Sequence, residues 1–155
     1  MFVFYIEDEQ IKPFMNKLLL EDCFDKLEVK GVELETLVKY EIQGNINKEY
    51  LKEAEERYYA KWSELRPYIF QLIKGSNKPK KLNVILMPDN EALNSLHPNA
   101  ASMSLNMLYE NDVVVCTTGT SQKAFSLDKG VDMAWEDCIQ KFFKKIGIHI
   151  TTHLE

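Results

Sequence analysis

The chain has 155 residues, of which 45% are hydrophobic and 28% charged, the composition of an ordinary globular protein long enough to bury a core. This length favours one domain, and the composition excludes a disordered tail, a collagen-like repeat and a disulfide scaffold. The formal net charge of −5 supplies no overall basic field that would attract nucleic acid or an anionic membrane.

The N-terminal third predicts a strand, a helix and a hairpin. Residues 1–6 form an apolar run without preceding basic residues, which predicts a strand rather than a signal peptide. A helix is expected next, with Asp8 as its cap and apolar residues three and four positions apart on one face. From residue 25 to 47 the apolar period changes to two, which predicts two strands in a hairpin with a bulge at Gly31.

Residues 51–75 predict a helical insert. Seven apolar residues keep the three-and-four spacing there, and they are Leu51, Ala54, Tyr58, Trp62, Leu65, Ile69 and Leu72. Pro67 removes one backbone donor and crowds the preceding turn, so either a kinked helix or two helices joined near Ser63 are expected.

The C-terminal half predicts four strands and two helices. A strand at 82–87 precedes a short helix capped by Asp89. The alternation that follows predicts a three-stranded meander, with strands at 102–109, 113–118 and 123–127 and a turn at 119–121.

The chain is expected to end in a helix and a tail. An amphipathic helix over 131–146 completes a domain that spans residues 1–147, and residues 148–155 form the tail. Leu154-Glu155 look like the remnant of a purification tag. The resulting order predicts an α+β fold with two halves that open alike.

Two stretches resemble a bacterial family known only as a domain of unknown function. They are Trp-Ser-Glu-Leu-Arg-Pro at 62–67, continued by 70–75, and Cys-Thr-Thr-Gly-Thr-Ser at 116–121. The resemblance covers nearly the whole chain and implies no activity.

A more distant resemblance is to a single domain of the bacterial DNA sliding clamp. Residues 2–14 resemble its opening strand and helix, and residues 88–127, which end in Phe125-Ser126-Leu127, resemble its second half. Clamp domains contain two β-α-β-β-β units, so the resemblance implies a DNA-clamp-like module to which the helical insert and the C-terminal helix are additions.

In a clamp, lysines and arginines on inner helices face the DNA backbone. The matching first helix here carries lysines, but the second, at 89–96, carries two acids and no base. A further lysine group follows the insert. The resulting nucleic-acid candidates are Lys12, Lys17, Lys74, Lys78, Lys80 and Lys81, and a solvated loop is the alternative interpretation of the last four.

No catalytic signature is present: the sequence has no P-loop, G-x-G-x-x-G, H-E-x-x-H or G-x-S-x-G. His97 stands without a nameable partner, and His149 and His153 lie in the terminal tail, so no catalytic residue, metal site or cofactor is predicted. Cys116–Ser121 offers hydroxyl groups around Gly119, but ordinary strand threonines at a hairpin turn explain it as well.

The cysteines and the lack of long apolar runs indicate where in the cell the protein is expected. Cys23, Cys116 and Cys138 form no C-x-x-C pair, which favours a reducing cytoplasm. No apolar run is long enough to span a bilayer, so no membrane partner is expected.

Three functions follow from these patterns. The first is a non-enzymatic binding or assembly module that joins a protein partner or further copies of itself, with a link to nucleic acid or replication proteins. The second is a small-ligand binder or enzyme with a pocket between the helical insert and the sheet, lined by Trp62, Glu64 and Arg66. The third is a structural partner protein that uses exposed aromatic residues of the insert.

Overall fold

The computed structural model describes residues 1–51, 57–75 and 78–153. The elements in chain order are β1 (Val3–Ile6), α1 (Ile11–Leu19), β2 (Glu28–Glu35), β3 (Lys39–Gln43), α2 (Trp62–Ile73), β4 (Lys81–Met87), α3 (Asn90–Leu96), β5 (Ala100–Glu110), β6 (Val113–Gln122), α4 (Gly130–Lys145) and β7 (Ile150–Thr151).

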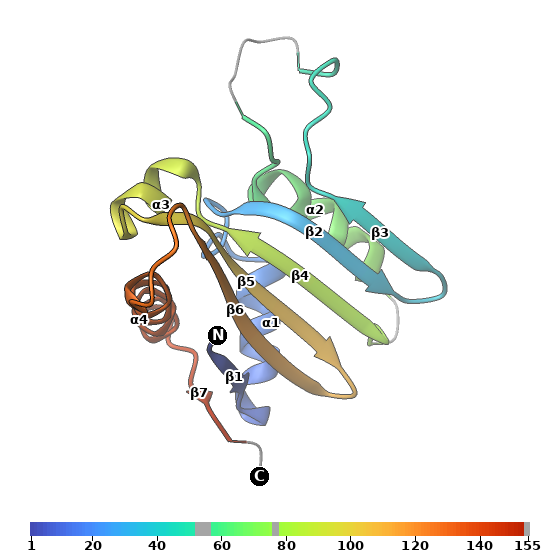
Figure 1. The fold of residues 1–155 in the computed structure, drawn as a ribbon. Coiled ribbons are helices and arrows are strands. Elements are labelled where there is room, and N and C mark those ends of the chain that lie inside the picture. Colours follow the sequence, from blue (N-terminus) through green and yellow to red (C-terminus); the bar gives the residue numbers. More distant parts are fainter. Residues whose placement is uncertain (52–56, 76–77, 154–155) are drawn as a thin grey trace.

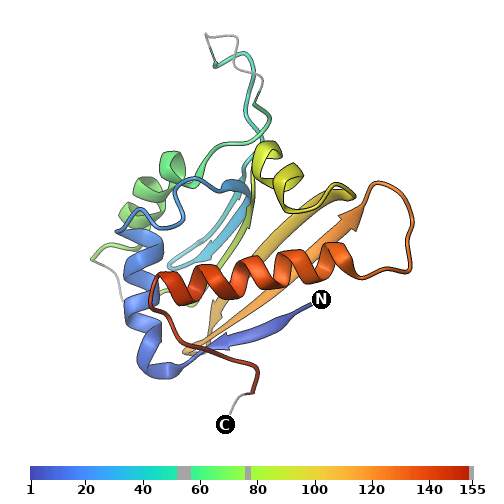
Figure 2. The same cartoon turned by 90° about the vertical axis from the view of Figure 1, so that its left-hand side faces the viewer.

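The fold is α+β, with the strands in one antiparallel sheet of order β3-β2-β4-β5-β6-β1-β7. Helices α1, α2 and α4 lie against one face of this sheet (Figures 1 and 2). Within the described residues, no helix covers the opposite face, which is turned toward the viewer in Figure 1. None of the described helices is long and apolar enough to cross a bilayer.

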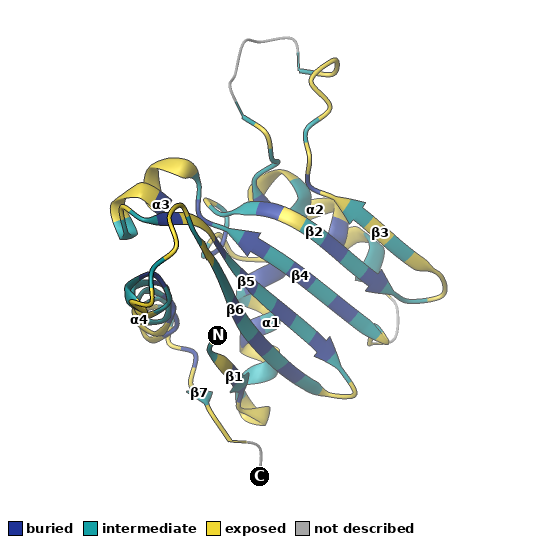
Figure 3. Cartoon of the chain, in the orientation of Figure 1, coloured by how far each residue is buried: buried dark blue, intermediate teal, exposed yellow. Residues whose placement is uncertain are grey.

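The core lies between the sheet and the three helices. Along β2, β4, β5 and β6 buried residues alternate with half-buried ones, because successive side chains point to opposite faces (Figure 3). A cluster of aromatic rings joins α1 and α4 to β1, and it consists of Phe4, Phe14, Phe24, Phe142 and Phe143.

The hairpin prediction is confirmed, whereas the first helix begins later than predicted. Strands β2 and β3 pair, and the register of β2 against β4 shifts between Val29 and Gly31, where the bulge was expected. Asp8 opens a short 3-10 turn, and no side chain caps α1, which begins at Ile11.

The insert is helical over only part of its predicted length. The described residues 57–61 are extended, with bridges from Tyr59 to Asn45 and from Lys61 to Glu28. The backbone of Ala60 bonds to Val29 on one side and to Gly44 on the other. A Cβ on Gly44 would lie 1.7 Å from the Val29 oxygen, so this close backbone crossing requires glycine. Residues 52–56 lie outside the described residues.

Helix α2 is continuous from Trp62 to Ile73 and contains Pro67. A single helix over the whole segment is therefore wrong, and the helix that the other alternative places before Ser63 falls partly outside the described residues.

The predicted strand at 123–127 is wrong. Strand β6 runs without a turn through residues 119–121, and residues 123–129 form a loop. Gly119 pairs with Ser104, and a Cβ there would lie 2.9 Å from the Ser104 hydroxyl oxygen. The glycine thus accommodates a close cross-strand neighbour rather than a turn. The predicted tail also contains β7, which pairs with β1.

Candidate functional site

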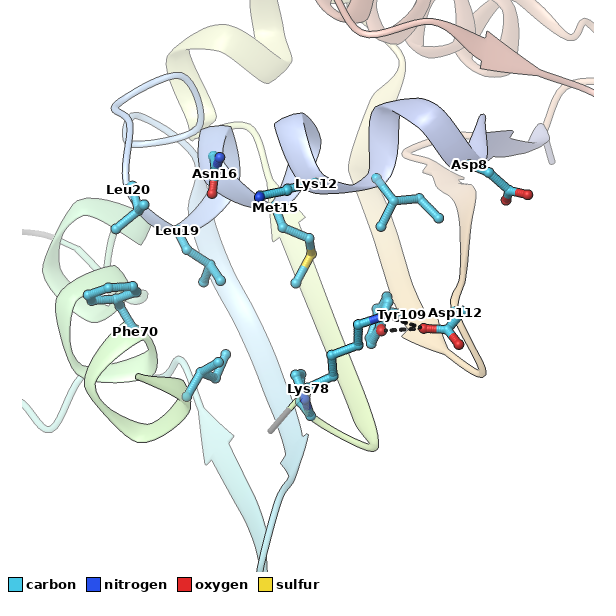
Figure 4. Close-up of a pocket in the computed structure, with 13 residues that line it drawn as sticks. Asp8, Lys12, Met15, Asn16, Leu19, Leu20, Phe70, Lys78, Tyr109 and Asp112 are labelled. Atoms are coloured by element: carbon cyan, nitrogen blue, oxygen red, sulfur yellow. Dashed lines mark hydrogen bonds and ion pairs between the residues drawn. The ribbon is translucent and has the colours of Figure 1, made fainter. Parts of the chain in front are cut away.

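A cavity of about 630 Å³ opens on the helix-covered side of the sheet, between α1, α2 and the end of β5. We call it the α1–α2 cleft (Figure 4). Its volume falls within the range of about 300–1,000 Å³ that is usual for ligand sites. Its apolar lining comes from α1, α2 and the chain before β4, and it consists of Ile11, Met15, Leu19, Leu20, Phe70, Ile73 and Pro79.

Helix α1 supplies the long wall of the cleft because its apolar surface is wider than the core requires. Phe14 and Leu18 are buried in the core. Leu19 is also buried, whereas Ile11 and Met15, four positions apart, are only partly buried, so they extend the apolar surface beside the core residues. Figure 4 shows the Met15 and Leu19 side chains on the cleft side of α1, with Phe70 of α2 across from them.

One end of the cleft is polar. The Tyr109 hydroxyl donates to Asp112 Oδ1 at 3.1 Å, and Lys78 Nζ lies 3.3 Å from the same oxygen. Asn111 and Asp112 adopt the left-handed conformation, with φ of 53° and 60°, which makes the tight turn from β5 to β6. Asp8 of the preceding 3-10 turn and Lys12 and Asn16 of α1 add further polar groups.

The pKa shifts of the two titratable groups at the polar end of the cleft favour binding over catalysis. Burial and the bond to Asp112 raise the pKa of Tyr109, so its hydroxyl keeps its proton at neutral pH. The Tyr109 hydroxyl and Lys78 lower the pKa of Asp112, which therefore stays ionised. The pair offers a protonated hydroxyl and an ionised carboxylate for hydrogen bonding rather than a general base poised near neutrality.

The described residues contain no cluster of three or more histidines, cysteines or acids that could hold a metal ion. His97 accepts a hydrogen bond from the Asn99 backbone in a turn, and His149 and His153 are exposed. All three cysteines are free, and burial raises the pKa of the Cys116 thiol well above its usual range. The structure thus places Cys116 as a packed core residue, away from the cleft.

The six predicted lysines do not form one surface. Lys12 and Lys78 line the cleft. Lys17 pairs with Glu21 at 3.5 Å, and Lys81 pairs at 3.2 Å with Glu33. The alternation of β4 places Lys81 on the open face of the sheet, away from α1. The remaining two, Lys74 and Lys80, are exposed beside the cleft end of α2 and the start of β4.

The three predicted pocket residues join α2 to its neighbours instead of lining the cleft. Trp62 is fully buried and donates from Nε1 to the Leu18 carbonyl at 2.7 Å. Glu64 binds Arg57 and accepts from the Lys61 backbone at 2.9 Å. Arg66 makes a two-bond ion pair with Asp25, each bond 2.8 Å long. The cleft lies beside the helix of the insert, but between that helix and α1 rather than between the insert and the sheet.

Replacing Arg66 with methionine is expected to lower the free energy of unfolding by about 1–3 kcal/mol, because the half-buried Asp25 carboxylate loses both donors. Urea unfolding monitored by circular dichroism measures this. The control is Lys17→Met, since the exposed Lys17–Glu21 pair contributes about 0.2–0.5 kcal/mol. Equal losses in the two variants would contradict the account.

Sequence reasoning missed Met15, Tyr109 and Asp112 as members of one site. The wide apolar surface of α1 is a signal that could have pointed to a site on that helix. No local pattern shows that the β5–β6 turn ends beside α1, because that proximity is set by the sheet order.

A model described as a family of unknown function, DUF5721, matches residues 17–151. The matched region includes the sheet from β2 to β7 and all of α2, α3 and α4. No curated protein and no solved structure matches the chain.

Proposed function

Since the chain belongs to the DUF5721 family of unknown function, we propose its function from its geometry: a non-enzymatic binding and assembly module that receives apolar side chains of a protein partner in the α1–α2 cleft. The observation that carries this proposal is the apolar wall of α1, on which Ile11 and Met15 are only partly buried and Leu20 is exposed.

The shape of the cleft favours a peptide segment as its occupant. Its lining runs along α1 from Ile11 to Leu20 at its end, which corresponds to about 14 Å of helix. Leu20 is 52% exposed although it is a large apolar residue. Each apolar side chain that a partner buries contributes about 1.5–3 kcal/mol before the cost of association.

The charges around the cleft favour a partner that carries both positive and negative groups. Asp8 and Asp112 are balanced by Lys12 and Lys78, so no net charge selects a strongly acidic or basic ligand. A small amphipathic ligand is the second candidate, and the hydrogen-bonding group formed by Tyr109, Asp112 and Lys78 supports it.

The clamp-like arrangement is also a proposal. The orders β1-α1-β2-β3 and β4-α3-β5-β6 support it, because both halves open with the strand–helix–strand–strand pattern of a clamp unit. The added helices α2 and α4 and the loop at 123–129 depart from that pattern.

Binding to DNA remains a prediction. Of the six lysines predicted to contact DNA, three are already paired with acids, which supports a protein partner over a nucleic acid. They are Lys17, Lys78 and Lys81. The free cysteines are compatible with the cytoplasm as the proposed location.

The fluorescent dye anilinonaphthalene sulfonate tests the proposed function, because its emission rises in an apolar site. We expect dilute protein to bind the dye at one site, and Met15→Glu to abolish binding by placing a charge on the apolar wall. The matched control is Met133→Glu on α4, where the side chain is already exposed. Loss of binding in both variants or in neither would contradict the proposal, provided that circular dichroism shows both to be folded.

A labelled DNA duplex at low salt provides the other arm of this test. Binding that weakens steeply with salt and depends on Lys12 and Lys78 would replace the protein-partner proposal by a nucleic-acid one.

A further inference from the structure

We propose that the occupant of the α1–α2 cleft is the loop of residues 123–129 from a second copy of this chain, so that copies join head to tail. This inference rests on the proposed function, and it names the partner. Its basis is that the same molecule presents an apolar cleft at one end and a pair of large, exposed apolar side chains at the other.

The exposed pair is Phe125 and Leu127, each of which is 88% exposed. Two such side chains only two positions apart form an apolar projection that a monomer leaves in water and that a docking contact would bury. Phenylalanine in particular supplies a large contact area at a low cost in conformational entropy.

The loop that carries this pair is held in place by polar side chains. Asn99 accepts a hydrogen bond from the Ala124 backbone and donates one to it, each 3.0 Å long. Gln122 donates to the Asp128 carbonyl at 3.2 Å and accepts from the Ser126 backbone at 3.0 Å. Phe125 and Leu127 are thus presented on a preorganised loop, which reduces the entropy lost on binding.

A second copy is needed because the loop cannot reach its own cleft. The loop follows the end of β6, whereas Tyr109 and Asp112 of the cleft flank the turn at its beginning. Ten residues of strand separate these ends, about 33 Å. Figure 2 shows α1 and the loop before α4 on opposite sides of the molecule.

Charges of both signs border both surfaces, since Asp128 lies beside the loop lysines and Lys12 and Lys78 lie beside the acids of the cleft, so ion pairs rather than net charge would join two copies. Lys123 and Lys129 flank the apolar pair of the loop, and Asp8 and Asp112 lie at the cleft. Among the described residues, neither Lys129 nor Asp8 forms an ion pair, so both charges are free for a neighbouring copy. A smaller cavity of about 300 Å³ between α3 and α4 lacks charged lining residues and offers no such pairing.

A contact between two different surfaces is heterologous. Each bound copy still presents a free loop and a free cleft, so assembly continues until a ring closes or a filament forms.

Analytical ultracentrifugation of the whole chain tests the inference. We expect the average mass of the wild type to rise with concentration, and the double variant Phe125→Ser/Leu127→Ser to remain monomeric. Met15→Glu and Leu20→Glu are expected to remain monomeric as well. Leu37→Glu, at a 97% exposed position that lines neither surface, is the control that keeps self-association.

The decisive experiment mixes a variant that lacks the loop side chains with a variant that lacks the cleft. The double loop variant retains its cleft and Met15→Glu retains its loop, so the two together are expected to form a one-to-one dimer of twice the monomer mass and nothing larger. Where Met15→Glu fails to fold, Leu20→Glu takes its place. A wild type that stays monomeric, association that survives the loop substitutions, or a mixture without the dimer would each overturn the inference. Dye binding at the cleft without self-association would overturn the inference alone and leave the proposed function standing.

Discussion

Replacing Trp62 with alanine is expected to lower the free energy of unfolding by about 3–5 kcal/mol, the range for removing a large core side chain. Trp62 is fully buried at the start of α2. The substitution opens a cavity under α2 and leaves the Leu18 carbonyl of α1 without the indole donor that lies 2.7 Å away. Both effects act at the contact that fixes the walls of the cleft relative to each other.

Urea unfolding monitored by far-ultraviolet circular dichroism measures this loss. Trp62→Phe keeps most of the volume and removes only the donor, so about 1–3 kcal/mol is expected from it. Tyr68→Ala, at an exposed position of the same helix, should change stability by no more than about 0.5 kcal/mol. A Trp62→Ala loss as small as that of Tyr68→Ala would show that α2 is not anchored through this residue.

Replacing Phe143 with alanine is expected to cost a similar amount, about 3–5 kcal/mol. Its ring is fully buried and packs against three partners from different parts of the chain, Phe4 of β1, Phe14 of α1 and Phe24 of the loop after α1. The contact with Phe4 is edge-to-face, with ring centroids 5.2 Å apart, an arrangement that adds about 0.5–1.5 kcal/mol to burial.

The same unfolding experiment, with Met133→Ala as the control, checks the role of this ring. Met133 lies on α4 but is exposed, so the control carries the helix-propensity change of α4 without a cavity. The expected result is a large loss for Phe143→Ala and almost none for Met133→Ala. Equal urea midpoints for the two variants would mean that the aromatic cluster does not hold α4 to the rest of the fold.

Local periodicity predicted the elements whose apolar faces meet the core directly. The stripes of α1 and α4 and the alternation of β2, β4 and β5 reflect which side chains are buried. The same alternation predicted strands at 102–109 and 113–118, and the turn between β5 and β6 contains Asn111 and Asp112, residue types that tolerate positive φ.

The errors arose where distant pairing decides the structure. Residues 57–61 have helical spacing, but their backbones bond to Val29 and Gly44, and α2 begins only after this crossing. Gly119 resembles a turn glycine, but its partner Ser104 lies on the neighbouring strand. Neither partner can be identified from the segment itself.

The cleft could be predicted only in part, for the same reason. The insert was expected to border a pocket, but Trp62, Glu64 and Arg66 satisfy their polar groups within the scaffold. The side chains that line the cleft come from α1, α2 and the β5–β6 turn, which are brought together by the tertiary fold.

The most direct test of the cleft as the binding surface is the spectrum of methionine methyl groups in dilute, isotopically labelled protein. Met15 lines the cleft and Met133 lies on α4. When anilinonaphthalene sulfonate is added, the account predicts that the Met15 methyl resonance shifts to saturation and that the Met133 resonance does not move. A Met15 resonance that stays unchanged while the dye binds would contradict it.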